Sequence, residues 1–252
     1  MATIDLNSDL GEGYGDYRMG DDAAMLRIVS SVNVACGFHA GDPQIMAKTF
    51  AAAKSAGVAI GAHPGYPDLQ GFGRRHIPYP PTEIERIVAY QIGAAMAVAS
   101  LAGHKITHVK AHGALANLAA DEIEIADAVL HAVKAVEPRL VVLAIAGTEI
   151  ERAAERHEMR VAREIFADRA YTPRGRLVPR KEPGAVIHDP EKAAKRVLEM
   201  LDAGAIIAVD GTRIKVGIDS ICVHGDTPGA VKLAETVRNA LTESGFGLRP
   251  FA

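Results

Sequence analysis

Short apolar segments that end in a titratable residue recur along this chain, and this repetition constrains its fold more than any other feature. Residues 31–43, SVNVACGFHAGDP, begin as a strand, break at Gly37, present His39 and end in Asp42-Pro43 before a helical pattern. Asp before a Pro at the first helical position is a favourable N-cap, so His39 is held between two rigid elements. Other apolar segments lead in the same way to Asp9, His63, Lys110, His112, Asp168, His224 and Asp226. A β/α barrel collects its functional side chains at such strand ends.

The alternation of these segments with helical patterns predicts an α/β fold, a seven-stranded β/α barrel that forms one domain over residues 1–252. Thr82, with Glu85 at the capping-box position, is expected to cap the longest helix. The segment IIAVDGTRIKV predicts a hairpin outside the barrel, with a type I′ turn at Asp210-Gly211. Barrel strands are expected at 3–9, from 31, and at 58–62, 107–111, 140–145, 160–166 and 220–224. Helices are expected at 43–57, 82–101, 121–136, 148–156, 190–202 and 228–245.

Composition and charge narrow the class of ligand. About half of the 252 residues are apolar, which is enough for one substantial core. The net charge of −3 and the scattered Lys and Arg argue against a nucleic-acid surface, so we expect a small-molecule ligand. The start of the chain does not resemble a signal peptide, and no apolar run approaches the roughly 18 residues that span a bilayer, so we expect a cytoplasmic protein. Cys36 and Cys222 form no zinc-type pattern and are expected to be reduced core residues.

Two long loops carry most of the cations near the predicted mouth of the barrel. Residues 65–81 are rich in Gly and Pro and include Arg74 and Arg75, and residues 170–188 include Arg180. Loops of this length in compact domains are usually functional. The second loop can be either a solvated surface or an anion-binding lid. The chain contains no glycine-rich phosphate fingerprint, so no ATP site is recognisable.

The residue types at the mouth leave two kinds of chemistry open. Asp9 with several imidazoles can form a metal site, or a metal-free acid and base pair that directs water at an amide carbonyl. Taken singly, a histidine such as His63 is more often a hydrogen-bonded loop residue than a catalyst. Because the histidines are spread over different strands and no HExxH pattern occurs, we expect no tightly bound transition metal.

Six motifs in order carry a resemblance that covers essentially the whole chain. They are DLNSDLGEG at 5–13, ACGFHAGDP at 35–43, GAHPGYPDLQGFGRR at 61–75, VKAHGALAN at 109–117, FADRAY at 166–171 and ICVHGDTPGA at 221–230. Together they resemble the LamB/YcsF family. The chain departs from the family pattern at Ala111 and Ala116, where a Pro and a Tyr are usual. The resemblance implies a seven-stranded β/α barrel similar to that of polysaccharide deacetylases.

The resemblance also implies a role as the A component of bacterial 5-oxoprolinase. That enzyme opens the lactam ring of 5-oxo-L-proline to L-glutamate at the expense of ATP, together with B and C subunits. Since this chain has no recognisable nucleotide loop, the ATP is expected to be bound with those partners. Two alternatives stay open: a metal-dependent carbohydrate N-deacetylase, and a non-catalytic protein that binds the lactam for its partners.

The positions and the resemblance together assign roles to fourteen residues at the mouth. The expected catalytic residues are Asp9, Glu12, His39, His63, Lys110 and His112. The expected substrate-binding residues are Asp42, Arg74, Arg75, Asp168, Arg169, Arg180, His224 and Asp226. All of these assignments require that the strand ends meet at one mouth.

Overall fold

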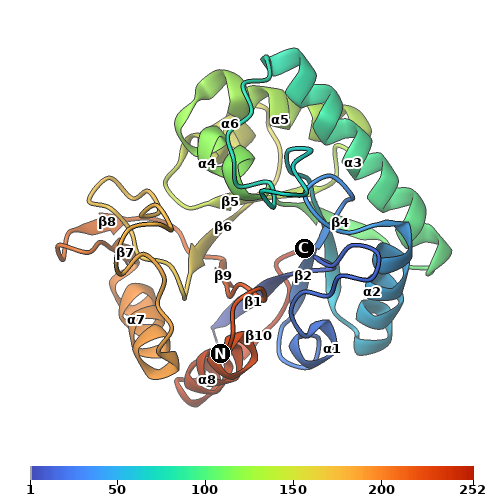
Figure 1. Ribbon diagram of the computed structural model, residues 1–252. Helices are drawn as coiled ribbons and strands as arrows, with labels where there is room; N and C mark the ends of the chain where they lie inside the picture. The colour runs from blue at the N-terminus through green and yellow to red at the C-terminus, as the bar shows by residue number, and fades with distance from the viewer. Residues whose placement is uncertain (1) are drawn as a thin grey trace.

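The computed structural model describes residues 2–252 and shows a closed parallel barrel (Figure 1). Six strands pair in chain order, and β9 pairs with both β6 and β1, which closes a ring of seven. The seven-stranded β/α barrel predicted from the sequence is therefore confirmed. The barrel strands are β1 (Thr3–Leu10), β2 (Ser31–Ala35), β3 (Ala59–His63), β4 (Ile106–Val109), β5 (Val141–Ile145), β6 (Val161–Phe166) and β9 (Ser220–Cys222).

Helices surround the barrel and shield its strands from solvent (Figure 1). The 3.6-residue period puts the apolar side chains of each helix on one face, and these faces form the main core with the strands. In the longest helix, for example, Ile84, Val88, Ile92, Ala95 and Ala99 are all buried. The helices are α1 (Asp22–Met25), α2 (Pro43–Ala56), α3 (Pro81–Leu101), α4 (Gly113–Asp121), α5 (Ile123–Val136), α6 (Glu149–Arg156), α7 (Pro190–Ala203) and α8 (Ala230–Glu243).

Local signals predicted the ends of α2 correctly, whereas the predicted cap of α3 is wrong. The Asp42 carboxylate accepts hydrogen bonds from the backbone N–H groups of Gln44 and Ile45, and Gly57 ends α2 in the left-handed conformation. Thr82 does not cap α3, because this helix already begins at Pro81, and its cap position makes no side-chain hydrogen bond within the described residues. Proline at the first helical position removes one of the N–H groups that lack a partner inside the helix.

Helix α4 is the main element that the sequence analysis missed. Its N-terminus follows His112 directly, and Gly113 makes the turn with a φ of 55°. The predicted helix from residue 121 exists as α5, but the extended backbone of Glu122 separates it from α4. Since α4 lies at the carboxyl ends of the strands, it forms one wall of the mouth (Figure 1).

The predicted hairpin is confirmed outside the barrel, but its turn is not type I′. Strands β7 (Ala205–Ile207) and β8 (Arg213–Lys215) pair antiparallel, and the Ala208 N–H donates to the carbonyl oxygen of Thr212. Three residues therefore form the turn, and of these only Gly211 has a left-handed φ, of 86°. A type I′ turn requires two successive residues in that conformation.

By length and composition alone, α3 is apolar enough to cross a membrane, which corrects the expectation that no such segment exists. One helix of this kind is weak grounds for a membrane protein, because a core helix of a soluble protein passes the same test. In this structure α3 packs against α5 and α2 in the outer layer of the barrel.

The interior of the barrel is polar where most barrels are apolar. Asp5 accepts hydrogen bonds from the hydroxyl groups of Ser30, Ser31 and Ser220. Further up, Asn33 donates to Asn7 and to Asp9 at the mouth. A chain of buried hydrogen bonds thus runs from the floor of the barrel to its mouth, and it keeps these polar groups satisfied.

A glycine provides space for a histidine inside the barrel, and the last residues cover the lower end of the barrel. The His108 ring fills the space where a Cβ atom on Gly61 would lie, at 2.2 Å from the ring, and its Nε2 is 3.0 Å from Asn33 Oδ1. The Phe251 ring packs on His108 at 4.9 Å and, with Ala252, covers the apolar start of β5 and β6. The short strand β10 (Gly247–Leu248) pairs with the beginning of β1 and directs the chain end to this position.

We predict that Asp5 makes the folded chain less stable as the pH rises. Burial raises the pKa of Asp5 to about 6, against 3.8 in the unfolded chain. The unfolded state therefore releases the proton first, and the free energy of unfolding falls between about pH 4 and about pH 6. Asp5 should therefore make the free energy of unfolding about 2 kcal/mol higher at about pH 4.5 than at about pH 7. Asp5→Asn should abolish this contribution, as measured by urea unfolding at the two pH values. Asp16→Asn, at an exposed position, is the control and should leave this difference unchanged.

Candidate active site

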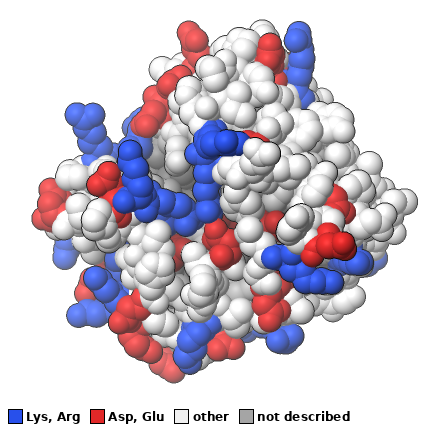
Figure 2. Space-filling view, in the orientation of Figure 1, with Lys and Arg blue, Asp and Glu red and all other residues white. Residues whose placement is uncertain are grey.

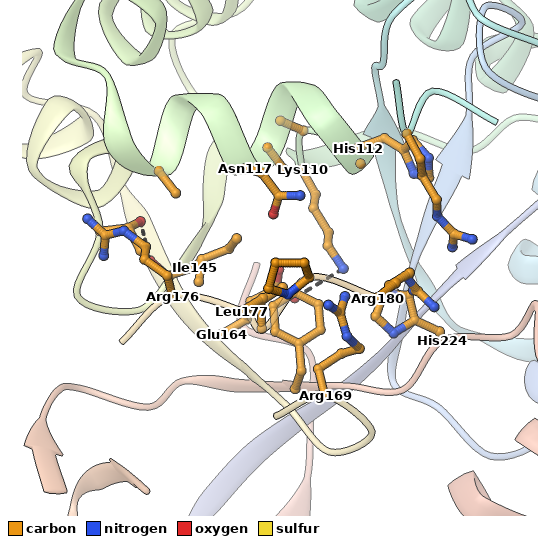
Figure 3. Close-up of a pocket in the computed structure, with 18 of the residues that line it drawn as sticks. Lys110, His112, Asn117, Ile145, Glu164, Arg169, Arg176, Leu177, Arg180 and His224 are labelled. Carbon is orange, nitrogen blue, oxygen red and sulfur yellow. Dashed lines mark hydrogen bonds and ion pairs between the residues drawn. The ribbon is translucent and has the colours of Figure 1, made fainter. Parts of the chain in front are cut away.

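A cavity of about 480 Å³ opens at the carboxyl ends of the strands, beside α4 (Figure 3). Its floor comes from the strand ends and its rim from the two long loops. Figure 2 shows Lys and Arg side chains gathered around a hollow on this face. The ionisable and amide side chains that line the cavity are Asp9, His63, Arg74, Lys110, His112, Asn117, Asp121, Glu164, Arg169, Arg176, Arg180, Lys181 and His224.

A buried lysine organises the floor. The Lys110 ammonium is 3.0 Å from Asp9 Oδ1, 3.2 Å from Glu164 Oε2 and 3.1 Å from Cys222 Sγ. It also lies 5.2 Å from the centre of the Phe166 ring. Burial alone would lower the pKa of Lys110, but Asp9, Cys222 and Glu164 outweigh it and hold the pKa well above its usual value. The floor therefore presents a permanent cation to the cavity.

The pKa values of the two carboxyl groups beside this cation are shifted in opposite directions. Burial tends to raise the pKa of Asp9, but His63 and Lys110 hold it well below its usual value. Burial raises the pKa of Glu164 to about 7 in spite of Lys110. Two neighbouring acids with pKa values pushed apart are suited to different roles, one as a carboxylate and one as a proton donor.

Three imidazoles pack on the other side of Asp9. The rings of His39 and His112 stack in parallel with their centres 3.7 Å apart, and His63 meets both edge-on. Burial, and after it the neighbouring imidazoles, lowers the pKa of His39 and of His112 well below the usual value. Both rings are thus neutral. Glycine at Gly65 and Gly73 permits this packing, because a Cβ atom at either position would lie 2.7 Å from His39.

Glu12 lies against the imidazoles in the loop after β1. It is 7% exposed, and burial together with the charges of Asp9 and Asp226 raises its pKa well above the usual value. Glu12 and His39 do not line the main cavity; both line an adjoining hollow that includes Tyr14 and Tyr17. The structure thus places both residues near the mouth, but behind His63 and His112 as seen from the cavity.

Ion pairs fasten the rim of the cavity. Asp168 Oδ2 is 2.9 Å from His224 Nδ1, and Arg74 donates to Asp226 Oδ2 at 2.7 Å. Arg169 donates to the carbonyl oxygen of Val178, which ties the second loop to the end of β6. These contacts mean that several of the predicted substrate-binding residues also shape the mouth.

The second loop covers the cavity rather than extending into solvent. Arg176, Arg180 and Lys181 line the cavity, whereas Arg174 is exposed and does not. Arg176 pairs with Asp121 at the end of α4. Arg180 is half-buried and has no ion-pair partner within residues 2–252. The loop thus lies over the cavity, and its role as an anion-binding lid stays a prediction.

Four predicted substrate-binding residues do not line the cavity: Asp168 and Asp226, which pair with His224 and Arg74 at its rim, and Asp42 and Arg75, which have other partners. Asp42 is occupied as the cap of α2 and also accepts from the Gly15 N–H. Arg75 pairs with Asp68, and its side chain is 64% exposed beside a separate shallow hollow. Proximity to a motif suggested these roles, but the side chains stabilise the loops that carry the site.

Sequence reasoning also missed three residues of the site. Glu164 and Phe166 belong to the buried strand β6, and Asn117 belongs to α4. The signal for Glu164 was present, since a charged residue inside the apolar segment VAREIF must have a partner. Cys222 is a free, buried cysteine as predicted, but it also contacts Lys110.

The spread of the histidines over different strands does not argue against a metal in this fold. The ligand atoms of Glu12, His39, His63 and His112 all lie within 4.8 Å of one another, although the residues come from four segments. Wide spacing in the sequence therefore did not keep them apart. His108 is close in sequence to His112, but it lies in the barrel interior and takes no part in this cluster.

Comparison with known proteins assigns the chain to a family. The sequence profile of the LamB/YcsF family matches residues 4–252. The chain belongs to the LamB/YcsF family. A relative from Azorhizobium caulinodans, named as the A component of 5-oxoprolinase, is 57% identical over the full length of both chains. A relative of the same name from Rhodopseudomonas palustris (strain BisB5) is 57% identical over 99% of this chain and 98% of its own.

Solved structures agree with this family assignment. The lactam utilization protein from Thermus thermophilus superposes with a TM-score of 0.92 at 44% identity, covering 99% of this chain and 100% of its own. A protein from Enterococcus faecalis, at 14% identity and a TM-score of 0.56, shares the barrel alone. Ala111 and Ala116, where this chain departs from the usual LamB/YcsF pattern, both line the cavity.

We predict that Lys110 is required for the stability of the mouth. Lys110→Met leaves Asp9 and Glu164 buried without their cation, which should lower the free energy of unfolding by about 3 kcal/mol or more. Adding Glu164→Gln to this variant should restore part of the loss, because one of the two unpaired acids is then gone. Denaturant unfolding at neutral pH measures both effects. Lys105→Met, at an exposed position, is the control, and an equal loss there would contradict the role of the buried ion pairs.

Proposed function

We propose that this chain is the A component of a 5-oxoprolinase, which is a hydrolase that opens the lactam ring of 5-oxo-L-proline to L-glutamate with ATP and with B and C partner subunits. One observation carries the proposal. The relatives that match it end to end at 57% identity are named as the A component of 5-oxoprolinase, and the mouth of this barrel has the charges that such a substrate needs.

The charges suit a small anionic lactam. The substrate carries one carboxylate, which Arg180 is free to bind at the rim because it has no ion-pair partner within residues 2–252. The cavity of about 480 Å³ has room for a five-membered ring and a phosphate group. The remaining cations of the lid, Arg176 and Lys181, would face that phosphate.

The chemistry explains why ATP is needed. A five-membered lactam is a stabilised amide, and its ring closure is entropically favourable, so direct hydrolysis gains little. Phosphorylation of the lactam oxygen makes the carbon open to attack by water. The C–N bond then breaks as the nitrogen takes a proton, and a second water releases phosphate from the acyl phosphate that results.

The residues of the floor fit these steps. Asp9, held as a carboxylate, and His63, with Nε2 3.4 Å from Asp9 Oδ2, can accept a proton from the attacking water. Lys110 can stabilise negative charge that develops on oxygen. Glu164, with its raised pKa, can supply a proton to the departing nitrogen.

ATP binding is assigned to the partners. This chain has no glycine-rich phosphate loop, so the activated lactam would form where the subunits meet and then react over the barrel mouth. The use of ATP and the two free cysteines are consistent with the expected cytoplasmic location.

We predict that the chain alone forms neither glutamate nor ADP from 5-oxoproline and ATP, and that both form together once the B and C subunits are added. Glutamate and ADP assays on the separate and mixed components test this. ATP-driven glutamate formation by the isolated chain would show that a nucleotide site lies in this barrel and would contradict the assignment of ATP to the partners.

We predict that Asp9→Asn lowers ring opening by the assembled complex by about 100-fold or more, because the base or its orienting charge is lost. The measurement is kcat for glutamate formation, with complex assembly checked by size-exclusion chromatography. A protein that only binds the lactam would tolerate the change, so normal turnover by an assembled Asp9→Asn complex would contradict a catalytic role.

We predict that Arg180→Ala raises the KM for 5-oxoproline by about 10-fold or more, since a charge-assisted hydrogen bond is typically worth about 1.5–3 kcal/mol. Arg174→Ala is the matched control, because Arg174 lies on the same loop but is exposed and outside the cavity. An equal rise of the KM in the two variants would show only a general effect of the net charge and would contradict a specific contact of Arg180 with the substrate.

A further inference from the structure

Two histidines at the cavity wall face each other through one ring nitrogen each. His63 Nδ1 is 2.8 Å from the carbonyl oxygen of Lys110, and His112 Nε2 is 2.8 Å from that of Phe72. A carbonyl oxygen only accepts hydrogen bonds, so each of these nitrogens holds a ring proton. The remaining nitrogens, His63 Nε2 and His112 Nδ1, lie 3.1 Å apart. At this distance the two nitrogens hold either one shared proton or one metal ion between them.

The spacing of the two nitrogens matches that of neighbouring ligands on one metal ion. With Zn–N bonds of about 2.0–2.1 Å, adjacent ligand nitrogens are about 2.9–3.4 Å apart for angles between octahedral and tetrahedral. The backbone carbonyl behind each ring is also a typical partner of metal-bound histidine, since it fixes the tautomer and orients the free nitrogen. Both rings are therefore preset as ligands.

Two further ligand groups complete the set. Glu12 and His39 each bring a ligand atom within 4.8 Å of those of His63 and His112. His39 is 1% exposed, and neither of its ring nitrogens has a hydrogen-bond partner in the part of the chain that the structure describes. A buried imidazole without a partner is costly, so a ligand for His39 is expected. Asp9 Oδ2, 3.4 Å from His63 Nε2, adds negative charge beside the cluster.

We propose that Glu12, His39, His63 and His112 bind one divalent transition-metal ion, with zinc as the best match. Three imidazoles and one carboxylate form a donor set that suits zinc and its first-row neighbours rather than magnesium or calcium. The site lies at the edge of the cavity, since His63 and His112 also line the cavity wall.

A second group of potential metal ligands lies in the mouth, but it already contains a cation. Asp9, Cys222 and His224 also converge, but the Lys110 ammonium already lies 3.0 Å from Asp9 Oδ1 and 3.1 Å from Cys222 Sγ. The Lys110 ammonium therefore occupies the place that a metal ion would take in this second cluster. Beside the first cluster, the side chain of Arg74 pairs instead with Asp226.

The four ligands are not equivalent. The parallel stacking of His39 on His112 places a shared ion out of the plane of at least one ring, so His39 must tilt to bind. His63 and His112 meet edge-on, with the facing nitrogens 3.1 Å apart. We therefore expect His39 to contribute least to affinity.

Metal binding by the purified chain tests the proposal without any assay of lactam opening. After removal of metals with a chelator and dialysis, titration calorimetry with Zn²⁺ should show one ion per chain, and Co²⁺ should give the visible absorption of a bound ion. His112→Gln and Glu12→Gln should each weaken binding by about 100-fold, and His39→Ala by about 10-fold. Circular dichroism confirms that each variant is folded.

His157→Gln is the control. His157 and His131 form a second pair of edge-on imidazoles on the surface, next to Asp127, and could bind zinc adventitiously. The control should leave the high-affinity site intact. The proposal is overturned if the unaltered chain shows no saturable binding of Zn²⁺. It is also overturned if folded His112→Gln and Glu12→Gln variants bind Zn²⁺ as tightly as the unaltered chain does.

Discussion

The ion pairs of Lys110 hold the mouth of this barrel together. Its ammonium bridges Asp9 on β1 and Glu164 on β6 and touches Cys222 on β9, so three neighbouring strands share one buried cation. Removing the cation would leave two buried acids without a partner. This lowers the free energy of unfolding far more than replacing the whole set of charges by apolar residues would. The position of Asp9, and through it that of His63, depends on this cation.

Below the mouth, the barrel maintains a polar interior through a connected set of hydrogen bonds. Asp5 is held by hydroxyl groups, and the asparagines relay hydrogen bonds upward to Asp9. The absent side chain of Gly61 provides the space for His108. Such a network specifies one arrangement of the strands, because a shift of one register would break many bonds at once.

Above the mouth, the two loops and α4 enclose a cavity over the strand ends, and Lys and Arg side chains line it. The cluster of imidazoles lies behind one wall of this cavity. The membership of the LamB/YcsF family and the charges of the cavity support lactam opening in a complex with partner subunits. The cluster raises a separate question about a metal ion. The two proposals meet at Asp9 and His63: a His63 Nε2 that binds a metal ion no longer accepts a proton, which leaves that role to Asp9. The two proposals are tested by different measurements.

The sequence by itself determined the barrel and much of its mouth. Apolar strands that end in Asp9, His63 and Lys110 can meet only at the carboxyl edge of parallel strands, so their convergence followed from the alternation of elements. The tertiary structure decided what sequence spacing does not encode. It turned Arg75 away toward Asp68, placed Glu164 beneath Lys110, and brought four potential ligands together from separate segments. The reason is physical: the pattern of buried positions is local and periodic, whereas the partner of each polar side chain depends on how distant loops fold over the strand ends.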